Sequence, residues 1–521
     1  MFRSLLAALL SLLSVVIVSA QQDEPLARAR PEDEGVSSAG ISRFLLDAGH
    51  SKNEFHSFMF LRHGKVIAEG WWNPYGPGLK HTLYSVSKSF TSTAVGFAVS
   101  EGRLSVDDKI VSFFPAALPD SVSPYLAAIT VRDMLNMLEG QDPDPSGIVA
   151  ATDSDWVKKF MTIPIVHQPG TSFLYNTIGV YVLSAIVQKV TGQRLIDYLE
   201  PRLFKPLGIS GADWEVSPQG INVGGWGLRL RTEDLAKVGE LYLQKGNWNG
   251  RQLLPEKWIG DAVTSRNDEG PAWAQHISRD SSDWRQGYGY LFWRCRHGAF
   301  RADGAFGQYI IVMPDQDAVI AITSETGDMQ DELNLIWNDL LPAIHNGPLP
   351  VDKAAYGTLR RQLAALSLPL PPATIDAPLA AHLSGSTFHL AANDARLKDL
   401  AVSFAGDTCS VTLTTDTAAY RLGFGRGEWR IGRTARQGPG IARGSIPGKP
   451  IYQVAGTYSW KDDHTLELII RYIESPHTQT ILCHFNGDEM TAEIHNSFDK
   501  IDNRMIINGK RLNSAPLPCP A

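Results

Sequence analysis

The sequence predicts an α+β domain, an antiparallel sheet with flanking helices and a helical subdomain, followed by an all-β barrel or sandwich. Hairpin-like strand runs stand near both ends of the first 345 residues, with helical periodicity between them. A proline-rich stretch, Leu368 to Pro372, separates this part from the rest. From about residue 378 onward the chain contains short alternating runs typical of strands.

The length of 521 residues exceeds what one ordinary hydrophobic core organises, so two domains are expected. The predicted boundaries are residues 1–20 for a signal peptide, 21–350 for the α+β domain, 351–377 for a linker with a short helix, and 378–521 for the β domain. The net charge of −7 and the lack of a basic run exclude a typical nucleic-acid partner.

The first twenty residues have the pattern of a secretory signal peptide. Arg3 is the charged start, residues 5–18 form the apolar run, and Val18-Ser19-Ala20 fits a cleavage site. The run is too short for a stable membrane span, and no later stretch is long and apolar enough. We therefore expect cleavage after Ala20, a secreted or periplasmic protein, and no membrane span after cleavage. The oligomeric state stays open.

Cysteines and histidines give little sign of a metal centre. The four cysteines, Cys295, Cys409, Cys483 and Cys519, allow three disulfide connectivities, and Cys409 with Cys483 is the favoured pair because both fall in the β domain. There is no CxxC or HExxH motif, and the 14 histidines lack metal-ligand spacing. We expect no metal site.

Within the α+β domain the expected order is hairpin, helices, strands and a closing helix. The turn His63-Gly64-Lys65 divides the first hairpin, while Gly102 and Gly192 end two helices as C-caps. The expected helices are 41–48, the helix that begins at Ser85, 155–161, 178–190, 232–244, 329–344 and 356–366, with short amphipathic pieces at 104–114 and 129–138. The expected strands are the two halves of 58–69, then 288–296, a strand start or turn at 301–308, and a hairpin of 309–313 with 318–323.

In the β domain the clearest strand-like runs are 402–413, 418–423, 466–472 and 478–485. We find no chemistry-bearing motif in them. The domain is therefore interpreted as a packing or oligomerisation module, with substrate gating or cell-wall binding as the alternative.

The strongest chemical signal is Tyr84-Ser85-Val86-Ser87-Lys88-Ser89-Phe90. Positions i and i+3 of a helix share a face, so the Ser85 hydroxyl and the Lys88 amine can meet. Burial would disfavour the charged amine, and the helix dipole favours negative charge on the serine oxygen, which together activate a nucleophile. The alternative is a helix-capping serine beside a solvated lysine. Ser497 to Lys500 repeats the tetrad without an apolar helix behind it.

Two further stretches carry candidate site residues. Tyr175 lies on a loop before a helix, where it could relay a proton if cations lower its pKa, or simply pack its ring and bond its hydroxyl. The segment Gly224-Gly225-Trp226-Gly227 could bring Trp226 to a pocket wall, or only make a tight bend into the next helix.

Together these stretches resemble the serine β-lactamase and penicillin-binding-protein superfamily. The similarity covers about residues 30–345 and includes the class C-related branch of esterases, D-amino-acid peptidases and 6-aminohexanoate-dimer hydrolases. The motifs that carry it are "LYSVSKSF", "ITVRDML", "PGTSFLYNT…VTG", "GGWGL…TEDLAKVGELYL" and "DGAFGQYIIVMPDQDAV".

The resemblance implies acyl transfer through a serine ester without metal or organic cofactor. Ser85 would attack the carbonyl, while Lys88 and Tyr175 would jointly move protons. The oxyanion would lie between the backbone N–H groups of Ser85 and Ala305. The same motifs supply further oxyanion or substrate-binding candidates: Gly304, Asp303, Thr177, Asn176, Trp226 and Phe306.

The sequence departs from the family pattern twice. Thr177 replaces the amide of the usual Tyr-x-Asn, and a related sub-pattern tolerates a small hydroxyl there. The Lys-Thr-Gly of penicillin-recognising members reads Ala302-Asp303-Gly304. Asp303 would repel a substrate carboxylate unless Arg301 turns inward, so a neutral or cationic ester or amide is favoured.

The sequence leaves three candidate functions. The first is an exported serine hydrolase of a small ester or amide, working through an acyl-serine. The second is a β-lactamase or D-Ala-D-Ala peptidase. The third is a catalytically silent penicillin-binding-like or cell-wall-binding protein. An α/β-hydrolase is disfavoured because the chain has no Gly-x-Ser-x-Gly elbow.

Overall fold

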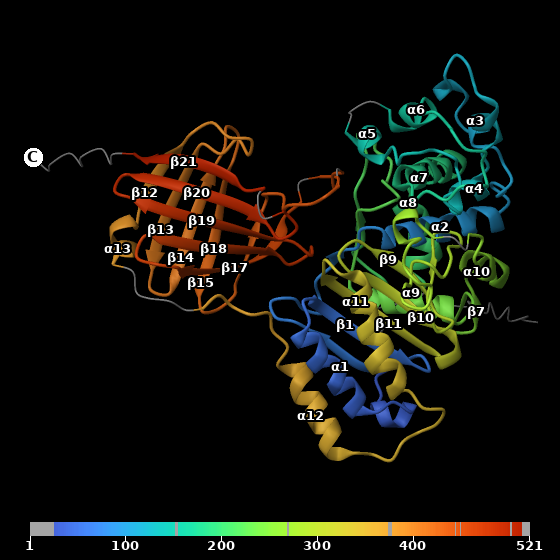
Figure 1. The fold of residues 1–521 in the computed structure, drawn as a ribbon, viewed down its shortest axis with the longest axis horizontal. Coiled ribbons are helices and arrows are strands. Elements are labelled where there is room, and N and C mark those ends of the chain that lie inside the picture. Colours follow the sequence, from blue (N-terminus) through green and yellow to red (C-terminus); the bar gives the residue numbers. More distant parts are fainter. Residues whose placement is uncertain are drawn as a thin grey trace, which may run out of the picture.

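The computed structural model describes residues 25–151, 155–267, 270–372, 378–442, 444–448, 450–500 and 503–512. These residues form an α+β domain and a β-barrel that lie side by side (Figure 1). The predicted fold class is therefore confirmed, with the barrel as the correct choice for the β domain. The predicted signal peptide and Cys519 lie outside the described residues.

An antiparallel sheet forms the base of the α+β domain, and in the described part of the chain it has six strands in the order β2-β1-β11-β10-β9-β8. The first and last hairpins pair with each other, because Phe58 of β1 lies opposite Ile322 of β11. The strands are β1 (Glu54–Arg62), β2 (Lys65–Trp71), β8 (Trp293–Arg294), β9 (Phe300–Gly304), β10 (Gln308–Met313) and β11 (Ala318–Glu325).

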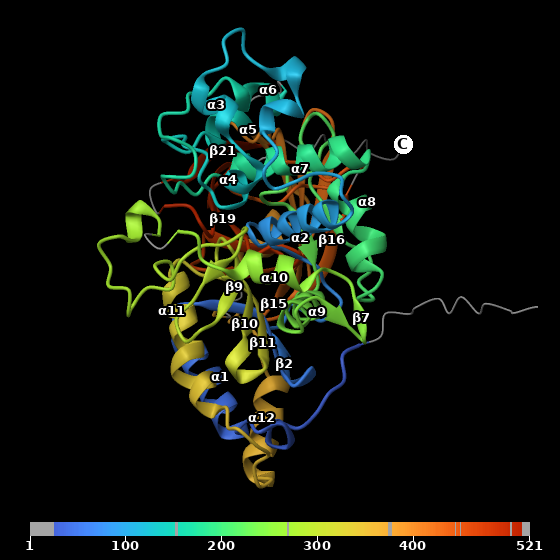
Figure 2. The same ribbon diagram turned by 90° about the vertical axis from the view of Figure 1, so that its right-hand side faces the viewer.

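Helices cover both faces of this sheet, which explains why its central strands β10 and β11 are buried along almost their whole length. On one face α1 (Ser38–His50) packs Phe44 against Phe55 and Phe58, beside α11 (Met329–Leu335) and α12 (Lys353–Ala364) (Figures 1 and 2). On the other face α9 (Thr232–Leu243) contacts β10 and β11. The predicted closing helix is present, although after α11 it continues as a π turn (Ile336–Leu340) and a 3₁₀ turn (Leu341–Ala343).

The helical subdomain stands above the sheet, against α2 (Val86–Ser100) (Figure 2). As predicted, the helix α7 (Thr177–Thr191) ends at Gly192, which adopts a left-handed conformation with φ of 72°. The other helices of the domain are α3 (Pro124–Ala128), α4 (Val131–Leu135), α5 (Ser146–Ala150), α6 (Trp156–Met161), α8 (Leu195–Leu199) and α10 (Glu256–Val263). Short strands are β3 (His81–Thr82), β4 (Asp213–Trp214), β5 (Leu228–Leu230), β6 (Asn247–Trp248) and β7 (Arg251–Gln252).

The predicted strand 288–296 is wrong over most of its length. Only β8 is regular, because Leu291 adopts a left-handed backbone with φ of 62° that interrupts extended structure. The Leu291 carbonyl instead accepts a hydrogen bond from Ser89 of α2 at 2.7 Å.

The barrel closes through a parallel contact between β15 and β17, so that nine of its described strands make a ring and β16 pairs along the first half of β17. Alternating burial along β14 and β19 places every second side chain in the barrel core. The strands are β12 (Ser386–Leu390), β13 (Asp399–Ala405), β14 (Thr408–Thr414), β15 (Ala419–Arg426), β16 (Arg430–Thr434), β17 (Tyr452–Trp460), β18 (Thr465–Tyr472), β19 (Thr478–Asn486), β20 (Glu489–Asn496) and β21 (Met505–Arg511), preceded by α13 (Leu379–Leu383).

The favoured disulfide between Cys409 and Cys483 is not formed. Both cysteines are free thiols, each fully buried in the barrel core. They behave as small apolar side chains there, which is how buried free cysteines commonly contribute to a core.

Polar contacts dock the barrel on the α+β domain. Arg471 of β18 forms an ion pair with Glu54 of β1, with 2.8 Å between Nη2 and Oε2. The connection between β16 and β17, described for residues 435–442, 444–448 and 450–451, reaches across to the first domain. There the Val216 N–H donates to the Ser445 carbonyl at 2.8 Å, and the Ser445 N–H donates back at 3.2 Å.

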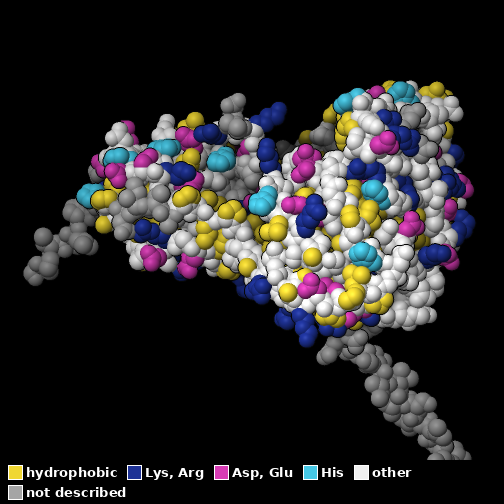
Figure 3. All heavy atoms as spheres, turned by 60° about the horizontal axis from the view of Figure 1, so that its bottom comes forward, with side chains coloured by type: hydrophobic (Ala, Val, Ile, Leu, Met, Phe, Trp, Pro, Cys, Tyr) yellow, Lys and Arg dark blue, Asp and Glu magenta, His cyan; other side chains and the backbone are white. Residues whose placement is uncertain are grey.

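The surface carries charges of both signs. On the face shown in Figure 3, Lys and Arg side chains alternate with Asp and Glu and gather in no single-sign patch. Among the described residues no helix has the length and apolar character needed to cross a membrane.

Candidate active site

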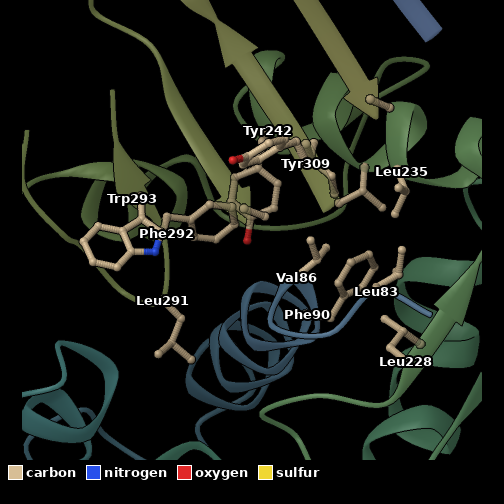
Figure 4. Close-up of a cluster of buried hydrophobic side chains, with 14 of the residues drawn as sticks. Leu83, Val86, Phe90, Leu228, Leu235, Tyr242, Leu291, Phe292, Trp293 and Tyr309 are labelled. Carbon is tan, nitrogen blue, oxygen red and sulfur yellow. The ribbon is translucent and has the colours of Figure 1, made fainter. Parts of the chain in front are cut away.

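Helix α2 carries the Ser85 and Lys88 tetrad into the centre of the α+β domain. Every residue from Val86 to Ala98 is buried, which is more than the single apolar stripe indicated by the sequence. Figure 4 shows the first turn of the helix among buried side chains that include Leu83 and Leu228. The helix tolerates this burial because most of its buried hydroxyls find partners, as Thr91 donates to the Gly224 carbonyl at 2.9 Å.

The predicted meeting of Ser85 and Lys88 is present. Lys88 Nζ lies 2.8 Å from Ser85 Oγ and donates to the Gly225 carbonyl at 2.8 Å. Lys88 is 1% exposed, and this burial lowers its pKa to about 7. Ser85 occupies the N-cap position, yet its side chain makes no capping hydrogen bond. The alternative of a capping serine beside a solvated lysine is therefore wrong.

Tyr175 lies over the same pair. Its ring centroid is 4.8 Å from Lys88 Nζ, and the ring stacks on Trp293 with centroids 5.8 Å apart. Burial raises the pKa of the Tyr175 hydroxyl well above its usual value, and the negative charge of Asp303 adds to this, while a hydrogen bond with Ser85 opposes it. The Arg301 cation also opposes the rise but does not outweigh burial, so the condition considered for Tyr175, a pKa lowered by cations, is not met. The hydroxyl stays protonated at neutral pH, which suits a proton donor.

Gly304 brings strand β9 directly against the backbone before α2. A Cβ atom at this position would lie 2.1 Å from the Leu83 carbonyl oxygen and 3.1 Å from the Ser85 nitrogen. Only glycine permits so close an approach. Among the described residues, neither the Ser85 N–H nor the Ala305 N–H has a hydrogen-bond acceptor, so both are free to donate to a ligand oxygen.

Gly304→Ala is expected to lower kcat/KM for an ester by about 10²-fold, as when one oxyanion donor is displaced. The added methyl must push β9 away from Ser85, because the atoms it meets belong to the backbone. The matched control is Gly327→Ala, an exposed glycine of the same domain with nothing within 4 Å of the added atom. Steady-state kinetics and thermal melting of both variants check this; equal activity of the two would contradict it.

A cavity of about 390 Å³ opens beside Ser85, a size within the usual range for small-molecule sites. Its walls come mainly from three parts of the chain: the stretch that contains Ser85, the helical subdomain, and the barrel. The lining residues are Tyr84, Ser85, Ser146, Gly147, Ala150, Ala151, Thr177, Gly225, Trp226, Ala305, Ile441 and Ala442. Of the predicted binding residues, the cavity thus gathers Thr177, Trp226 and Ala305 next to Ser85.

The family profile described as "Beta-lactamase" matches residues 56–342, which is more than half of the chain. The chain belongs to the β-lactamase family. It is accordingly a serine hydrolase of that family, and the resemblance inferred from the motifs is confirmed.

Individual relatives support the assignment. The chain is 27% identical over 291 residues to the 6-aminohexanoate-dimer hydrolase of Paenarthrobacter ureafaciens, covering 52% of this chain and 73% of that protein. It is 30% identical over 140 residues to the N-acetylmuramyl-L-alanine amidase of Bacillus subtilis (strain 168), covering 24% and 32%. A solved structure described as "Putative 6-aminohexanoate-dimer hydrolase from Bacillus anthracis" aligns with a TM-score of 0.50 at 19% identity, covering 64% of this chain and 90% of that one, and so shows a shared fold.

Other predicted residues of this β-lactamase-family chain lie outside the cavity wall. Asn176 is fully buried, where it caps α7 by accepting from the Gly179 N–H at 3.0 Å and donates to Gln141 at 2.6 Å. Phe306 packs against Tyr84 and His477 in the domain interface, with ring centroids 5.7 and 4.8 Å apart.

Asp303 forms a buried ion pair with Arg301. Arg301 Nη2 lies 2.9 Å from Asp303 Oδ2, because residues two apart on β9 face the same side. Burial raises the pKa of Asp303, and Arg301 opposes the rise. The guanidinium is fully buried, 4.6 Å from the ring centroid of Trp284. Arg301 thus turns toward Asp303, and neither side chain lines the cavity.

The barrel holds Tyr84, the residue that precedes Ser85, through a chain of polar contacts. Tyr84 has a left-handed backbone with φ of 45°, a conformation that stores strain in a residue with a side chain. Its hydroxyl hydrogen bonds to Nε2 of His477, whose Nδ1 lies 2.7 Å from Glu325 Oε1. The carboxylate favours a proton on Nδ1, so that Nε2 accepts from Tyr84.

Sequence reasoning missed the cavity residues of α5 and of the barrel. Ile441 and Ala442 belong to no recognisable motif, and their place beside Ser85 follows only from how the domains dock. Among the described residues no group of His, Cys, Asp or Glu side chains is arranged to hold a metal ion.

Proposed function

We propose that this chain is an exported serine hydrolase that cleaves an ester or an amide through an acyl-serine intermediate. The observation that carries the proposal is the buried Lys88 amine 2.8 Å from Ser85 Oγ. Membership of a hydrolase family and similarity to a protein named as a dimer hydrolase support it. Export rests on the apolar N-terminal run.

In this proposal the neutral Lys88 amine takes the Ser85 proton as Oγ bonds to the substrate carbonyl carbon. The carbonyl π electrons move onto oxygen, where the N–H groups of Ser85 and Ala305 stabilise the negative charge. Tyr175 donates a proton to the leaving alcohol or amine as the old bond breaks, and is reprotonated from Lys88. Water then attacks the acyl-serine with the reverse proton movements, releasing the acid and restoring Ser85.

We propose that the substrate carries no carboxylate on the side that faces the Ala302-Asp303-Gly304 stretch. Penicillin-type and D-Ala-D-Ala substrates need a cation there, but the guanidinium of Arg301 is buried and occupied by Asp303. A β-lactamase or D-Ala-D-Ala peptidase is therefore the less favoured candidate.

The test combines a fluorophosphonate probe with a substrate panel. We expect one probe per chain, attached to Ser85 by peptide mass spectrometry, and turnover of p-nitrophenyl esters or simple amides. Nitrocefin is expected to be turned over far more slowly. Absence of labelling would favour the catalytically silent alternative, and rapid nitrocefin turnover would overturn the inference from Asp303.

A further inference from the structure

His477 of the barrel is fully buried between the domains, and its ring contacts two residues next to the candidate oxyanion donors. Tyr84 directly precedes Ser85, and Phe306 directly follows Ala305. The His477 ring centroid lies 5.7 Å from that of Tyr84 and 4.8 Å from that of Phe306, the second pair edge to face. One side chain of the barrel thus contacts both segments that would form the oxyanion site.

Both contacted residues have a backbone conformation that needs support from its surroundings. Tyr84 has a φ of 45° and Phe306 a φ of 66°, in a left-handed region that bulky side chains rarely adopt. Such conformations persist where neighbouring contacts hold them, and they are concentrated at active sites. Relaxation at either residue would move the adjoining N–H group, that of Ser85 or that of Ala305.

Hydrogen bonds fix the orientation of the His477 ring. Its Nδ1 lies 2.7 Å from Glu325 Oε1, which favours a proton on that nitrogen, and its Nε2 bonds to the Tyr84 hydroxyl. Burial raises the pKa of Tyr84, so the hydroxyl keeps its proton at neutral pH and can donate to Nε2. Glu325 Oε1 also accepts from Ser497 Oγ of the barrel at 2.6 Å. The imidazole is therefore held at both nitrogens.

The strand end that holds His477 also holds Phe306. Glu325 is the last residue of β11, and the residues on either side of it donate to the Phe306 carbonyl. Ser324 Oγ does so at 2.8 Å and the Thr326 N–H at 3.1 Å. The loop that carries the Ala305 N–H is thus anchored to the same short segment as the histidine.

We infer that His477 is a positioning residue for the oxyanion site. It holds the Tyr84 hydroxyl by a hydrogen bond and the Phe306 ring by packing. These contacts keep the Ser85 and Ala305 N–H groups directed at one substrate oxygen, and donors fixed in advance stabilise a developing negative charge most effectively. The inference rests on the proposed hydrolase function, and it gives the barrel a part in the rate of the reaction.

His477→Phe tests the role, because phenylalanine keeps a ring but loses both hydrogen bonds. We expect kcat for a p-nitrophenyl ester to fall about 10-fold, less than the loss of a whole oxyanion donor, while KM stays within about threefold. In His477→Gln the amide can accept from Tyr84 and donate to Glu325, so kcat should return to within about threefold of wild type. Unchanged kcat in folded His477→Phe, or an equal loss in both variants, would overturn the inference.

Phenylboronic acid provides a readout that a merely structural role would not change. Ser85 Oγ adds to the boron, giving a tetrahedral adduct with an oxygen in the oxyanion position, whereas benzyl alcohol binds without using that position. We expect the Ki of phenylboronic acid to rise about 10-fold in His477→Phe, and that of benzyl alcohol to stay within about threefold. An equal rise of both Ki values would indicate general damage to the cavity and refute the positioning role.

The matched control is His56→Phe. His56 on β1 is also fully buried, and its Nε2 lies 3.1 Å from Glu54 Oε1. Its ring contacts within the described residues are with Tyr75 and His81, not with the residues beside the oxyanion donors. This variant should keep kcat within about threefold of wild type, and thermal melting verifies that it and the His477 variants fold. A loss in the control as large as in His477→Phe would count against a specific role.

Tyr84→Phe supplies a second route that does not depend on the folding of His477→Phe. It removes only the hydroxyl bonded to His477, so kcat should also fall about 10-fold, and the double variant should lose much less than the product of the two single losses. Unchanged kcat in Tyr84→Phe, or fully multiplicative losses, would contradict action through this hydrogen bond.

Ser85→Ala separates the inference from the proposed function. If Ser85→Ala still turns over esters at the wild-type rate, the hydrolase proposal fails, and the oxyanion role fails with it. If turnover needs Ser85 but His477→Phe keeps its kcat and its affinity for phenylboronic acid, only the positioning role is refuted.

Discussion

Ser85→Ala is expected to lower kcat/KM for short p-nitrophenyl esters by about 10⁴-fold or more, as loss of the nucleophile does in serine hydrolases. No neighbouring hydroxyl can replace it, because the helix dipole and the Lys88 amine both act at Ser85 Oγ. The measurement is steady-state kinetics with the fluorophosphonate probe as a parallel readout, which should no longer label the protein.

Ser92→Ala is the matched control for this variant. Ser92 lies on the same helix, is fully buried, and its Oγ has no hydrogen-bond partner among the described residues. Its replacement by alanine should leave kcat/KM within about threefold of the wild-type value, since it removes no bond. Wild-type turnover by Ser85→Ala would reject Ser85 as the nucleophile.

Lys88→Met is expected to lower kcat by about 10³-fold, within the range for removal of a general base. Methionine fills the buried site without a charge, so the helix should stay packed. The matched control is Lys237→Met, because Lys237 is also almost fully buried but lies on α9 outside the cavity wall. Kinetics and thermal melting of both variants are the measurements.

The pH profile gives Lys88 a second, independent signature. With its pKa lowered to about 7, the amine is protonated below that pH and cannot accept the Ser85 proton. Wild-type kcat/KM should therefore rise with pH through about 7 and then level off, and the residual activity of Lys88→Met should lack this rise. A wild-type profile that falls with increasing pH across this range would contradict Lys88 as the base.

The pair at the centre of the site was predictable because it is local. Ser85 and Lys88 lie three positions apart at the start of one helix, and helix geometry alone brings them together. The hairpins were predictable for the same reason, since turn residues such as Gly64 and Pro314 stand between the paired strands.

Features that depend on burial or on distant segments were not predictable. The pKa of Tyr175 is raised because its hydroxyl is buried, and no local sequence pattern reveals this burial. The strand expected around Leu291 fails because its carbonyl bonds to α2 instead of continuing the sheet. Ile441 and Ala442 lie more than 350 positions after Ser85, and no sequence period links them to it.

Both domains line the cavity beside Ser85, because the connection between β16 and β17 supplies part of its wall. The contacts of Lys88 and Tyr175 come from the first domain, whereas Ile441 and Ala442 of the second domain line part of the cavity. In the proposed mechanism, substitutions in that connection would change which substrates fit beside Ser85 without altering Lys88 or Tyr175. Under the proposed function, part of the substrate selectivity can therefore change independently of the proton-transfer groups.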